Sequence, residues 1–238
     1  ALHRLNLASP EMAQAAMHTT GQAFTLAFQM AGPHAQERGL EAIATAWREM
    51  KHIPSAVRWE RVNTTHPNTA PQSVIEKKFS IAPRGVALVI GCSTLPNWSA
   101  YPGLFASLVT GNGVIVKPHQ NAILPLAITV AAIRQTLKEG GFDPNLVSLL
   151  VDGATLAVTR DLATKSDIRI VDYTGNADFG MWLESNARQA VVFTQKSSVN
   201  CVVVESTNDY KGMLRNLAFG ASVFSGQLAT RSQTILVA

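Results

Sequence analysis

The chain has 238 residues, of which 20 are lysine or arginine and 16 are aspartate or glutamate, giving a formal net charge of +4. Hydrophobic residues make up 47% and charged residues 15% of the sequence. The charged fraction lies below the roughly 25% usual for globular domains, and the hydrophobic content is normal, so intrinsic disorder is excluded. Two cysteines cannot build a disulfide framework, and no apolar run reaches the ~18 residues of a membrane span. We therefore expect a soluble, cytoplasmic globular protein.

The positive charge does not indicate a nucleic-acid partner. Although the sequence pI is 9.3, no run of basic residues exceeds the pair Lys77-Lys78. Nucleic-acid-binding proteins usually concentrate such residues on one face or along one helix. The first ten residues also lack the basic-then-apolar order of a signal peptide. We expect neither nucleic acid nor a membrane among the partners.

The N-terminal quarter of the chain is predicted to be helical. Residues 11–30 are rich in alanine, methionine, glutamine and leucine, and Phe24 and Phe28 share one helical face. Pro33 ends that pattern, and apolar residues at helical spacing resume over 36–50. We assign 1–61 to a helical region that packs on the following domain. Residues 62–84, which begin with turn formers and two prolines, are assigned to a connection.

From residue 85 the pattern changes to short apolar runs rich in β-branched residues, which are typical of strands buried on both faces. These runs are 86–90, 114–116, 147–151, 168–171, 190–193 and 201–204. Helical segments are predicted between most of them, at roughly 102–109, 122–138, 155–163, 178–187 and 209–223. Alternating strands and helices predict a doubly wound, mainly parallel Rossmann-like sheet, so the fold class is α/β. Ligands of such sheets bind beyond the carboxyl ends of the strands.

The phosphate-binding fingerprint GxGxxG is absent, because the nearest candidate, Gly111-Asn-Gly113, opens a strand rather than a helix. Two other stretches lie at predicted strand ends. Lys117 precedes a proline, which favours extended geometry, and a lysine there can donate to ribose hydroxyls or a phosphate. An ordinary solvated lysine is the alternative. The second stretch, 172–176, offers a cap oxygen and free backbone N–H groups at a helix start, which suits a pyrophosphate, although a plain helix cap is equally consistent.

Several motifs in order resemble the aldehyde dehydrogenase superfamily. They are Gly85–Ile90, Pro96–Pro102, Thr110–Asn112, Lys117-Pro118, Tyr173–Asn176 with Gly180, and Ser225-Gly226-Gln227. Within that superfamily, three further stretches are similar to the PaaN branch, which is associated with phenylacetate degradation. These stretches are Ala31–Arg38, Gly103–Ser107 with Lys117–His119, and Lys211–Ala218. The resemblance implies a chain that continues beyond this sequence, so we assign 85–224 to an NAD(P)-binding domain and 225–238 to the start of a truncated catalytic domain.

The resemblance also implies oxidation of an aldehyde by NAD or NADP. In this chemistry a cysteine thiolate attacks the aldehyde, a hydride passes to the nicotinamide, and a glutamate activates the water that releases the acid. The matching positions here depart from the pattern. The nucleophile position is Ala229, the general-base position is Gln195, and the position of the asparagine that stabilises the oxyanion is matched by Ser99, with Asn97 displaced by two residues.

The cofactor positions implied by the resemblance are better preserved. Lys117, Thr174, Gly175, Asn176 and Gly180 match places that hold the ribose and the pyrophosphate, and His119 is assigned to the ribose side or to packing. Gln120 stands near a glutamate of NAD-preferring members. Loss of that carboxylate removes repulsion of a 2′-phosphate and permits NADP. No ligand set is spaced for a metal.

The cysteines offer a single alternative nucleophile. Cys201 lies among valines and is expected to be a small core residue. Cys92 follows the strand at 86–90, at the edge of the sheet where ligands bind. The first hypothesis, which follows from the resemblance, is a fragment of an NAD(P)-dependent, PaaN-type aldehyde dehydrogenase that acts on a small-molecule aldehyde substrate and forms homo-oligomers. The second is a non-catalytic nucleotide-binding or assembly module with the same fold.

Overall fold

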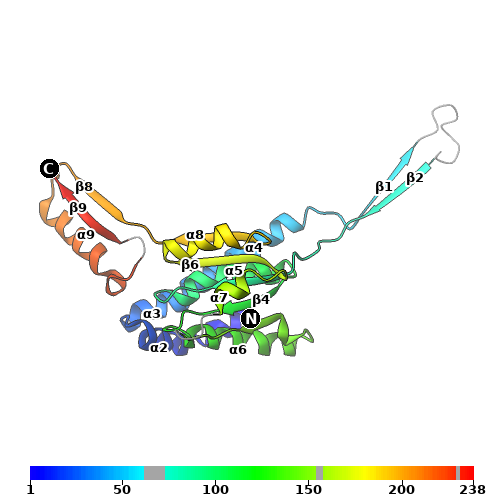
Figure 1. The fold of residues 1–238 in the computed structure, drawn as a ribbon, viewed down its shortest axis with the longest axis horizontal. Coiled ribbons are helices and arrows are strands. Elements are labelled where there is room, and N and C mark those ends of the chain that lie inside the picture. Colours follow the sequence, from blue (N-terminus) through cyan, green and yellow to red (C-terminus); the bar gives the residue numbers. More distant parts are fainter. Residues whose placement is uncertain (62–72, 154–157, 229–230) are drawn as a thin grey trace.

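A computed structural model describes residues 1–61, 73–153, 158–228 and 231–238. The chain begins with a layer of helices (Figure 1), namely α1 (Leu2–Leu7), α2 (Ser9–Thr20), α3 (Phe24–Ala31) and α4 (Pro33–Met50). Gly21 ends α2 in the left-handed conformation, with φ of 74°, so the helix expected over 11–30 is two helices. Phe24 and Phe28 stack with ring centres 6.2 Å apart, as their spacing predicts.

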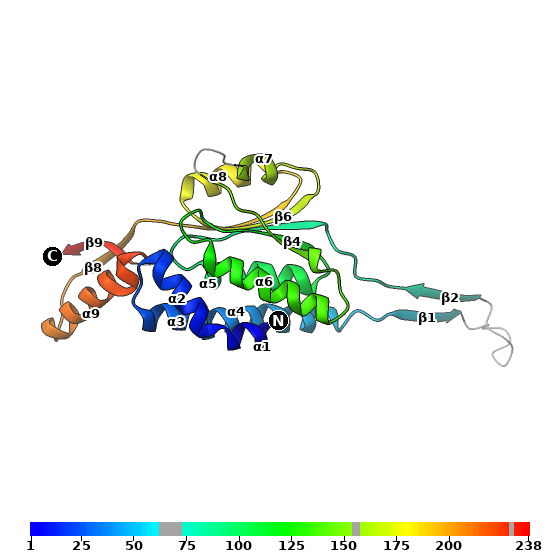
Figure 2. The ribbon, with the colours of Figure 1, turned by 90° about the horizontal axis from the view of Figure 1, so that it is seen from below.

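After the helices the chain enters a projecting antiparallel ribbon, which differs from the expected helical end and irregular connection. Strand β1 (Ala56–Arg61) pairs with β2 (Ser73–Lys78). Apolar Val57 and Trp59 alternate with charged residues, and this period of two favours a strand over a helix. Every residue of both strands is exposed, and Figures 1 and 2 show the ribbon extending away from the body of the protein. The expected turn at 62–72 lies outside the described residues.

The central sheet has five parallel strands in the order β5-β4-β3-β6-β7. The strands are β3 (Val86–Ile90), β4 (Gly113–Lys117), β5 (Val147–Leu149), β6 (Ile168–Gly175) and β7 (Val191–Lys196). The connecting helices are α5 (Pro96–Val109), α6 (Leu124–Glu139), α7 (Thr159–Ala163) and α8 (Ala177–Asn186). The predicted α/β class is therefore confirmed, with helix boundaries shifted by a few residues. Residues 155–157 of the helix expected at 155–163 lie outside the described part.

Helices cover both faces of this sheet. Figure 2 shows α1–α6 on one side of the sheet and α7 and α8 on the other. The larger core joins Ala87 and Val89 of β3 to Leu104 of α5 and Leu126 of α6, and Met12 of α2 belongs to the same cluster. The smaller core lies on the opposite face, where Leu88, Val171 and Leu183 are buried. Alternate residues of β3 thus enter different cores, as a strand buried on both faces requires.

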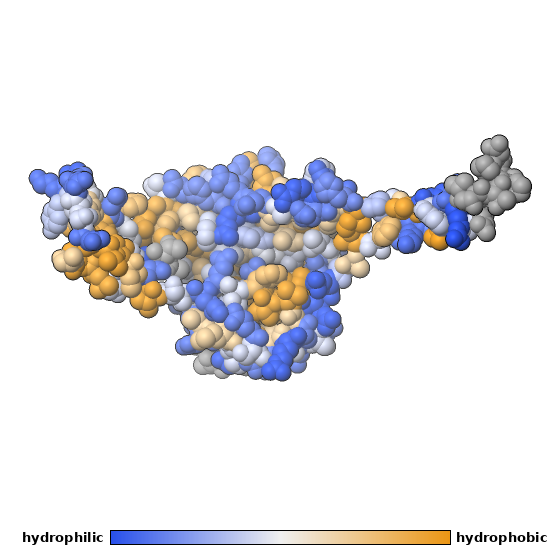
Figure 3. All heavy atoms as spheres, turned by 90° about the horizontal axis from the view of Figure 1, so that it is seen from above, coloured by the Kyte–Doolittle hydropathy of each residue, from blue (hydrophilic) through white to orange (hydrophobic). Residues whose placement is uncertain are grey.

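The last segment forms a separate parallel unit rather than a sixth strand of the central sheet. Strand β8 (Asn200–Val204) pairs with β9 (Ser232–Val237), and α9 (Tyr210–Ser222) lies between them in sequence. The central sheet therefore ends at β7. Residues 200–224, which we assigned to the same domain, lie outside this sheet. Cys201 is exposed, so its predicted core position is wrong. Apolar side chains remain exposed at this end of the molecule (Figure 3), including Val203, Tyr210, Phe219 and Leu236, because no second layer formed by the described residues covers them.

One carboxylate is partly buried between the sheet and the helices. Asp172 on β6 packs against Gly103 of α5, where an added Cβ would clash with the carboxyl group. Burial raises the pKa of Asp172 to about 6, and the charge of Arg38 opposes that rise. Arg38 itself lies over the Trp98 ring, 3.7 Å from its centre. The fold therefore holds an acid whose ionised form is disfavoured, because partial burial removes some of the water that would solvate its charge.

We predict that Asp172→Asn stabilises the protein in a pH-dependent way. The folded-state pKa of about 6 lies above the unfolded value of 3.8, so stability falls as pH rises between these values. The variant should raise the free energy of unfolding by about 1–3 kcal/mol at pH 7.5 and by about half as much at pH 5. Urea unfolding at the two pH values measures this, with the exposed Asp167→Asn as the control. A gain that does not depend on pH would contradict the prediction.

Candidate functional site

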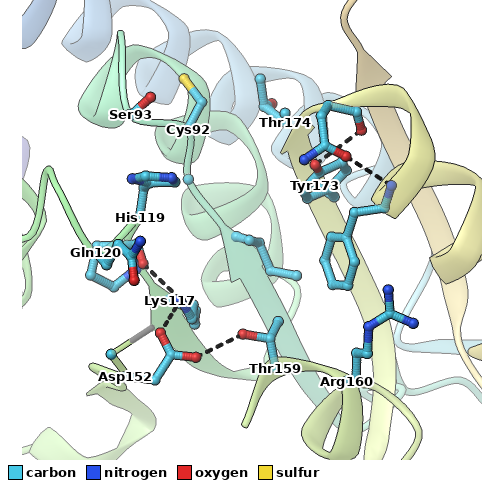
Figure 4. Close-up of a pocket in the computed structure, with 17 residues that line it drawn as sticks. Cys92, Ser93, Lys117, His119, Gln120, Asp152, Thr159, Arg160, Tyr173 and Thr174 are labelled. Carbon is cyan, nitrogen blue, oxygen red and sulfur yellow. Dashed lines mark hydrogen bonds and ion pairs between the residues drawn. The ribbon is translucent and has the colours of Figure 1, made fainter. Parts of the chain in front are cut away.

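A cavity of about 500 Å³ opens at the carboxyl ends of β3, β4 and β6 (Figure 4). In the sheet order, β3 has β4 on one side and β6 on the other, so the chain reverses its direction of winding there. Such a switch point leaves a crevice in which ligands of open α/β sheets bind. The lining residues that carry the argument below are Lys117, His119, Gln120, Asp152, Thr159, Arg160, Tyr173, Thr174, Gly175, Asn176 and Phe179.

Lys117 is a buried residue with a specific partner, so it is not the solvated lysine that the sequence left open. Its ammonium lies 2.5 Å from the Asp152 carboxylate and donates to the Pro118 carbonyl at 3.1 Å. The hydroxyl of Thr159, the first residue of α7, donates to the same carboxylate at 3.1 Å. Burial alone would raise the pKa of Asp152, but Lys117 and the hydrogen bonds from Thr159 and the Val158 backbone outweigh it and lower the pKa.

His119 and Gln120 extend the wall beyond Lys117. The Asn121 backbone N–H donates to Nδ1 of His119 at 3.2 Å, which leaves Nε2 as the protonated nitrogen of the neutral ring. Burial and then the nearby charge of Lys117 lower the pKa of His119. The histidine is therefore neutral at pH 7, where it can donate one hydrogen bond to a ligand. Gln120 is exposed and contributes an uncharged amide.

The end of β6 forms the facing wall and the start of α8. Asn176 caps α8, because its Oδ1 accepts from the Phe179 backbone N–H at 2.8 Å. The Tyr173 hydroxyl donates to the Asn176 carbonyl at 3.0 Å and holds the turn. In contrast, Oγ1 of Thr174 is buried and has no hydrogen-bond partner among the described residues. A buried hydroxyl without a partner at a cavity wall is a position that a bound polar group would satisfy.

The two glycines of this region allow close packing. Gly180 is buried on α8, and a Cβ there would lie 2.6 Å from Cγ of Lys196. A Cβ at Gly175 would clash with the Tyr173 hydroxyl. Any larger residue at either position would displace the side chains that shape the β6–α8 turn. Glycine at both positions therefore lets the Lys196 and Tyr173 side chains pack closely against the backbone.

Sequence reasoning missed two charged residues of the cavity. Asp152 follows β5 just as Lys117 ends β4, so the carboxyl-end rule could have identified it. Arg160 lies on α7, with its guanidinium carbon 4.4 Å from the centre of the Trp182 ring and 5.6 Å from that of Phe179. No local motif marks this arginine. Its position depends on the packing of α7 against α8, which the sequence pattern does not specify.

The predicted catalytic positions are not all brought to the cavity. Gln195 on β7 is exposed and pairs in register with Thr174, so it lies beside the cavity wall. Ser99 is buried in α5, donates to the Pro96 carbonyl at 3.2 Å and is absent from the cavity lining. The amide of Asn97 points into the core, where Nδ2 is 3.0 Å from the Thr129 hydroxyl. Ala229 lies outside the described residues.

The loop before Ala229 is held by the helical N-terminal region. Gln227 donates to the Thr20 carbonyl at 2.8 Å, and Ser225 donates to the Gly21 carbonyl at 3.2 Å. Phe224 and Ser225 adopt positive φ angles of 52° and 57°, a conformation rarely found outside glycine. The end of α2 therefore fixes a strained turn more than two hundred residues later in the chain. Strain of this kind concentrates at functional loops.

The cavity rim also contains Cys92. Its sulfur accepts from the Leu95 backbone N–H at 3.4 Å and lies 3.5 Å from the hydroxyls of Thr94 and Ser99. Cys92 is half-buried and lines the cavity, as its place after β3 predicts. Figure 4 shows it at the opposite end of the cavity from Asp152.

In 1–61, 73–153, 158–228 and 231–238 there is no group of three or more histidine, cysteine, aspartate or glutamate side chains that could hold a metal ion. Within these same ranges, no helix combines the length and the apolar character needed to cross a bilayer.

Comparison with known proteins identifies the family. The sequence profile described as "Aldehyde dehydrogenase family" matches residues 7–238, which is nearly the whole chain. The chain belongs to the aldehyde dehydrogenase family. The crystal structure of a NAD-dependent aldehyde dehydrogenase from Burkholderia multivorans is similar, with 50% identity and a TM-score of 0.92. That match covers 98% of this chain and 41% of the other.

Two more distant proteins also match this chain. Fatty aldehyde dehydrogenase HFD1 of Saccharomyces cerevisiae is 26% identical over 190 residues, which cover 78% of this chain and 34% of the relative. Glyceraldehyde-3-phosphate dehydrogenase GapN of Methanocaldococcus jannaschii, solved with NADP, is 17% identical with a TM-score of 0.76, covering 99% of this chain and 48% of that one. At that identity the likeness shows the fold alone. The chain spans less than half the length of these three proteins.

We predict that Lys117→Met destabilises the protein by about 3 kcal/mol, because it leaves the Asp152 carboxylate buried without a counter-charge. The double variant Lys117→Met/Asp152→Asn should recover most of that loss, since it removes the uncompensated charge. Urea unfolding at pH 7.5 measures both variants, with the exposed Lys165→Met as the control. Equal effects of Lys117→Met and the control would show that the ion pair does not contribute to stability.

Proposed function

We propose that this chain is the dinucleotide-binding part of an NAD(P)-dependent aldehyde dehydrogenase of the PaaN type, acting in the catabolism of aromatic compounds such as phenylacetate. The observation that carries the proposal is the cavity at the switch point, with a buried lysine on one wall and the orphaned Thr174 hydroxyl on the other. Three motif stretches of the PaaN branch support the finer assignment: 31–38, 103–107 and 211–218. A cytoplasmic location belongs to the same proposal.

The residues present fit a dinucleotide. The cavity volume lies within the range of ordinary ligand pockets, and the Thr174 hydroxyl lacks a partner that a ribose or phosphate oxygen would supply. Lys117 and His119 would face the ribose, and the Thr174–Asn176 turn would face the pyrophosphate. The bound nicotinamide would accept the hydride released from an aldehyde. The chain's own contribution is to position the dinucleotide and to exclude water from its polar groups.

The catalytic positions of this chain lack the groups that the reaction needs. Ala229 has no nucleophile, and Gln195 has an amide in place of a titratable carboxylate. These absences favour the second candidate, a non-catalytic nucleotide-binding or assembly module with the same fold. Cys92 is the alternative nucleophile, because its thiol reaches the cavity rim. Binding of the dinucleotide is common to both functions, whereas oxidation of an aldehyde distinguishes them.

We also propose that the protein forms homo-oligomers. Support comes from the β1–β2 ribbon, which is exposed along its full length, and from the apolar surface of the β8–α9–β9 unit. Phe219 is 67% exposed and Val237 is 72% exposed there, a high fraction for side chains of this type. Exposed apolar surface of this kind favours association with another chain.

We predict that the chain binds NAD or NADP and that the ion pair at Lys117 is needed for this. If Lys117 donates to the ribose as proposed, Lys117→Met/Asp152→Asn should weaken binding by about ten- to a hundred-fold in isothermal titration calorimetry. The double variant avoids an unpaired buried carboxylate, so it reports on binding rather than on folding. Lys165→Met serves as the matched control. Failure of the unaltered chain to bind either dinucleotide would refute the proposed function.

We predict that this chain does not oxidise aldehydes. The thiol and the carboxylate of the reaction act as a unit, so their joint loss should leave only residual catalysis. The test measures the absorbance of reduced nicotinamide with a panel of aromatic and aliphatic aldehydes, against the heat-treated chain. Sustained aldehyde-dependent reduction would contradict the prediction. Loss of that reduction in Cys92→Ser would then assign the nucleophile to Cys92.

A further inference from the structure

A groove on the surface lies apart from the cavity at the strand ends. It has a volume of about 350 Å³ and opens between α4, α5 and β7, the edge strand of the central sheet. Ala42, Ile170 and Phe193 form apolar walls, and Asp172 and Ser107 supply polar groups. No described residue lines both this groove and the cavity. The Asp172 groove is therefore a separate candidate site, and its volume suits a small ligand.

The carboxyl group of Asp172 has no close partner among the described residues. None of their ion pairs or hydrogen bonds includes it. The charge of Arg38 attracts it from farther away, but burial outweighs this attraction and raises the pKa of Asp172 to about 6. At pH 7.5 most of this carboxyl is ionised, and its charge is only partly compensated. A cation placed in the groove would stabilise it.

Ser107 provides a second, independent indication of a ligand. Its side chain lies in the groove lining and is only 5% exposed, yet its hydroxyl forms no hydrogen bond with a described residue. In contrast, the hydroxyl of Thr110, one turn later on α5, donates to the Ala106 carbonyl at 2.7 Å. Buried polar groups are almost always hydrogen-bonded, so an unpartnered hydroxyl beside a groove marks a place for a polar atom of a ligand.

The composition of the groove defines the chemistry of that ligand. Asp172 is the only charged residue in the described lining, so an ionised groove attracts cations and repels anions. An ammonium group can donate both to a carboxylate and to a hydroxyl oxygen, and its hydrogen bonds to a carboxylate are charge-assisted. The Phe193 side chain is 57% exposed and offers an apolar surface at the edge strand. A ligand with an apolar body and one ammonium group therefore matches all three features.

We propose that the Asp172 groove binds a small organic ammonium ion, whose nitrogen contacts Asp172 and Ser107 and whose apolar body packs on Phe193. This site is additional to dinucleotide binding and does not depend on it. It also gives the unpartnered carboxyl a role, since a group that lowers the stability of the fold and lies in a groove is a candidate functional residue.

The test is isothermal titration calorimetry with benzylammonium and its uncharged analogue benzyl alcohol at pH 7.5. The unaltered chain should bind benzylammonium about ten-fold or more tightly than benzyl alcohol. In Asp172→Asn the affinity for benzylammonium should fall by about ten-fold or more, whereas that for benzyl alcohol should change less than about three-fold. Ser107→Ala should weaken binding of benzylammonium by about three- to ten-fold.

Asp167→Asn is the matched control, because it removes the same charge from an exposed residue outside the groove lining. Both its affinities should equal those of the unaltered chain. Phe193→Ala should weaken binding of the two ligands to a similar extent, since both contain the same apolar ring. Urea unfolding of each variant confirms that the fold is retained.

The pH profile distinguishes a contact with Asp172 from a purely structural effect. Protonation of a group with a pKa of about 6 removes the charge, so benzylammonium should bind about ten-fold more weakly at pH 5 than at pH 7.5, while benzyl alcohol should not respond. Arg38 of α4, which stays charged over this range, and Glu41, which acts on Arg38, are the other charged groups involved. Helix α5 and β7 place no charged described residue in the lining.

The outcomes decide the inference separately from the proposed function. Equal affinities for benzylammonium and benzyl alcohol, or an equal loss of both in Asp172→Asn, overturn it. Competition between benzylammonium and a dinucleotide also overturns it, because the two sites share no described lining residue. If benzylammonium does not bind but Asp172→Asn weakens self-association in analytical ultracentrifugation, the occupant is a basic side chain of a second copy, and the small-molecule site is refuted.

Discussion

The buried ion pair between Lys117 and Asp152 is the constraint on which the rest of the site depends. It joins the end of β4 to the segment after β5, and the Thr159 hydroxyl extends the contact to the first turn of α7. Both charged groups are more than nine-tenths buried, so separating them would expose each to an uncompensated desolvation cost. The pair thereby fixes one wall of the cavity and places α7, with Arg160, at its border.

The opposite wall follows from a different kind of constraint. Strand β6 continues past its neighbour β3 and ends at Gly175, where the Asn176 cap starts α8 immediately. The Tyr173 hydroxyl and two closely packed glycines leave little freedom in this turn. One wall is therefore held by charge and the other by packing and hydrogen bonds. Between them lies the Thr174 hydroxyl, which has no hydrogen-bond partner among the described residues.

The N-terminal helices have a role beyond covering the sheet. The end of α2 binds the loop at 225–227 through two backbone carbonyls, and Gln22 just beyond it donates to the Thr94 carbonyl at 2.5 Å. Thr94 lies in the segment that follows β3 and forms the cavity rim at Cys92 and Ser93. The same helix end thus links the rim of the cavity to the loop that precedes Ala229. This arrangement explains why the strained turn at Phe224 and Ser225 persists.

By itself, the sequence determined the α/β class and the parallel strands, because these follow from local patterns. Local patterns also placed Lys117, Cys92 and the turn at 172–176 at strand ends, whereas His119 and Gln120 of the cavity lining were named only through the family resemblance. Apolar runs bounded by glycine or aspartate indicate buried strands, and residues that end such strands must share one edge of the sheet. The β1–β2 ribbon was also encoded locally, in an alternation of charged and apolar residues that the helical interpretation overlooked.

Only the tertiary structure decided that Lys117 is buried against Asp152 and that the Arg160 guanidinium packs on the Phe179 and Trp182 rings. It also decided that β8 leaves the central sheet and exposes Cys201. Each of these features depends on which elements contact one another in the folded chain. A valine-rich run predicts a buried strand whether or not a second layer covers it, so the sequence pattern does not distinguish the two cases.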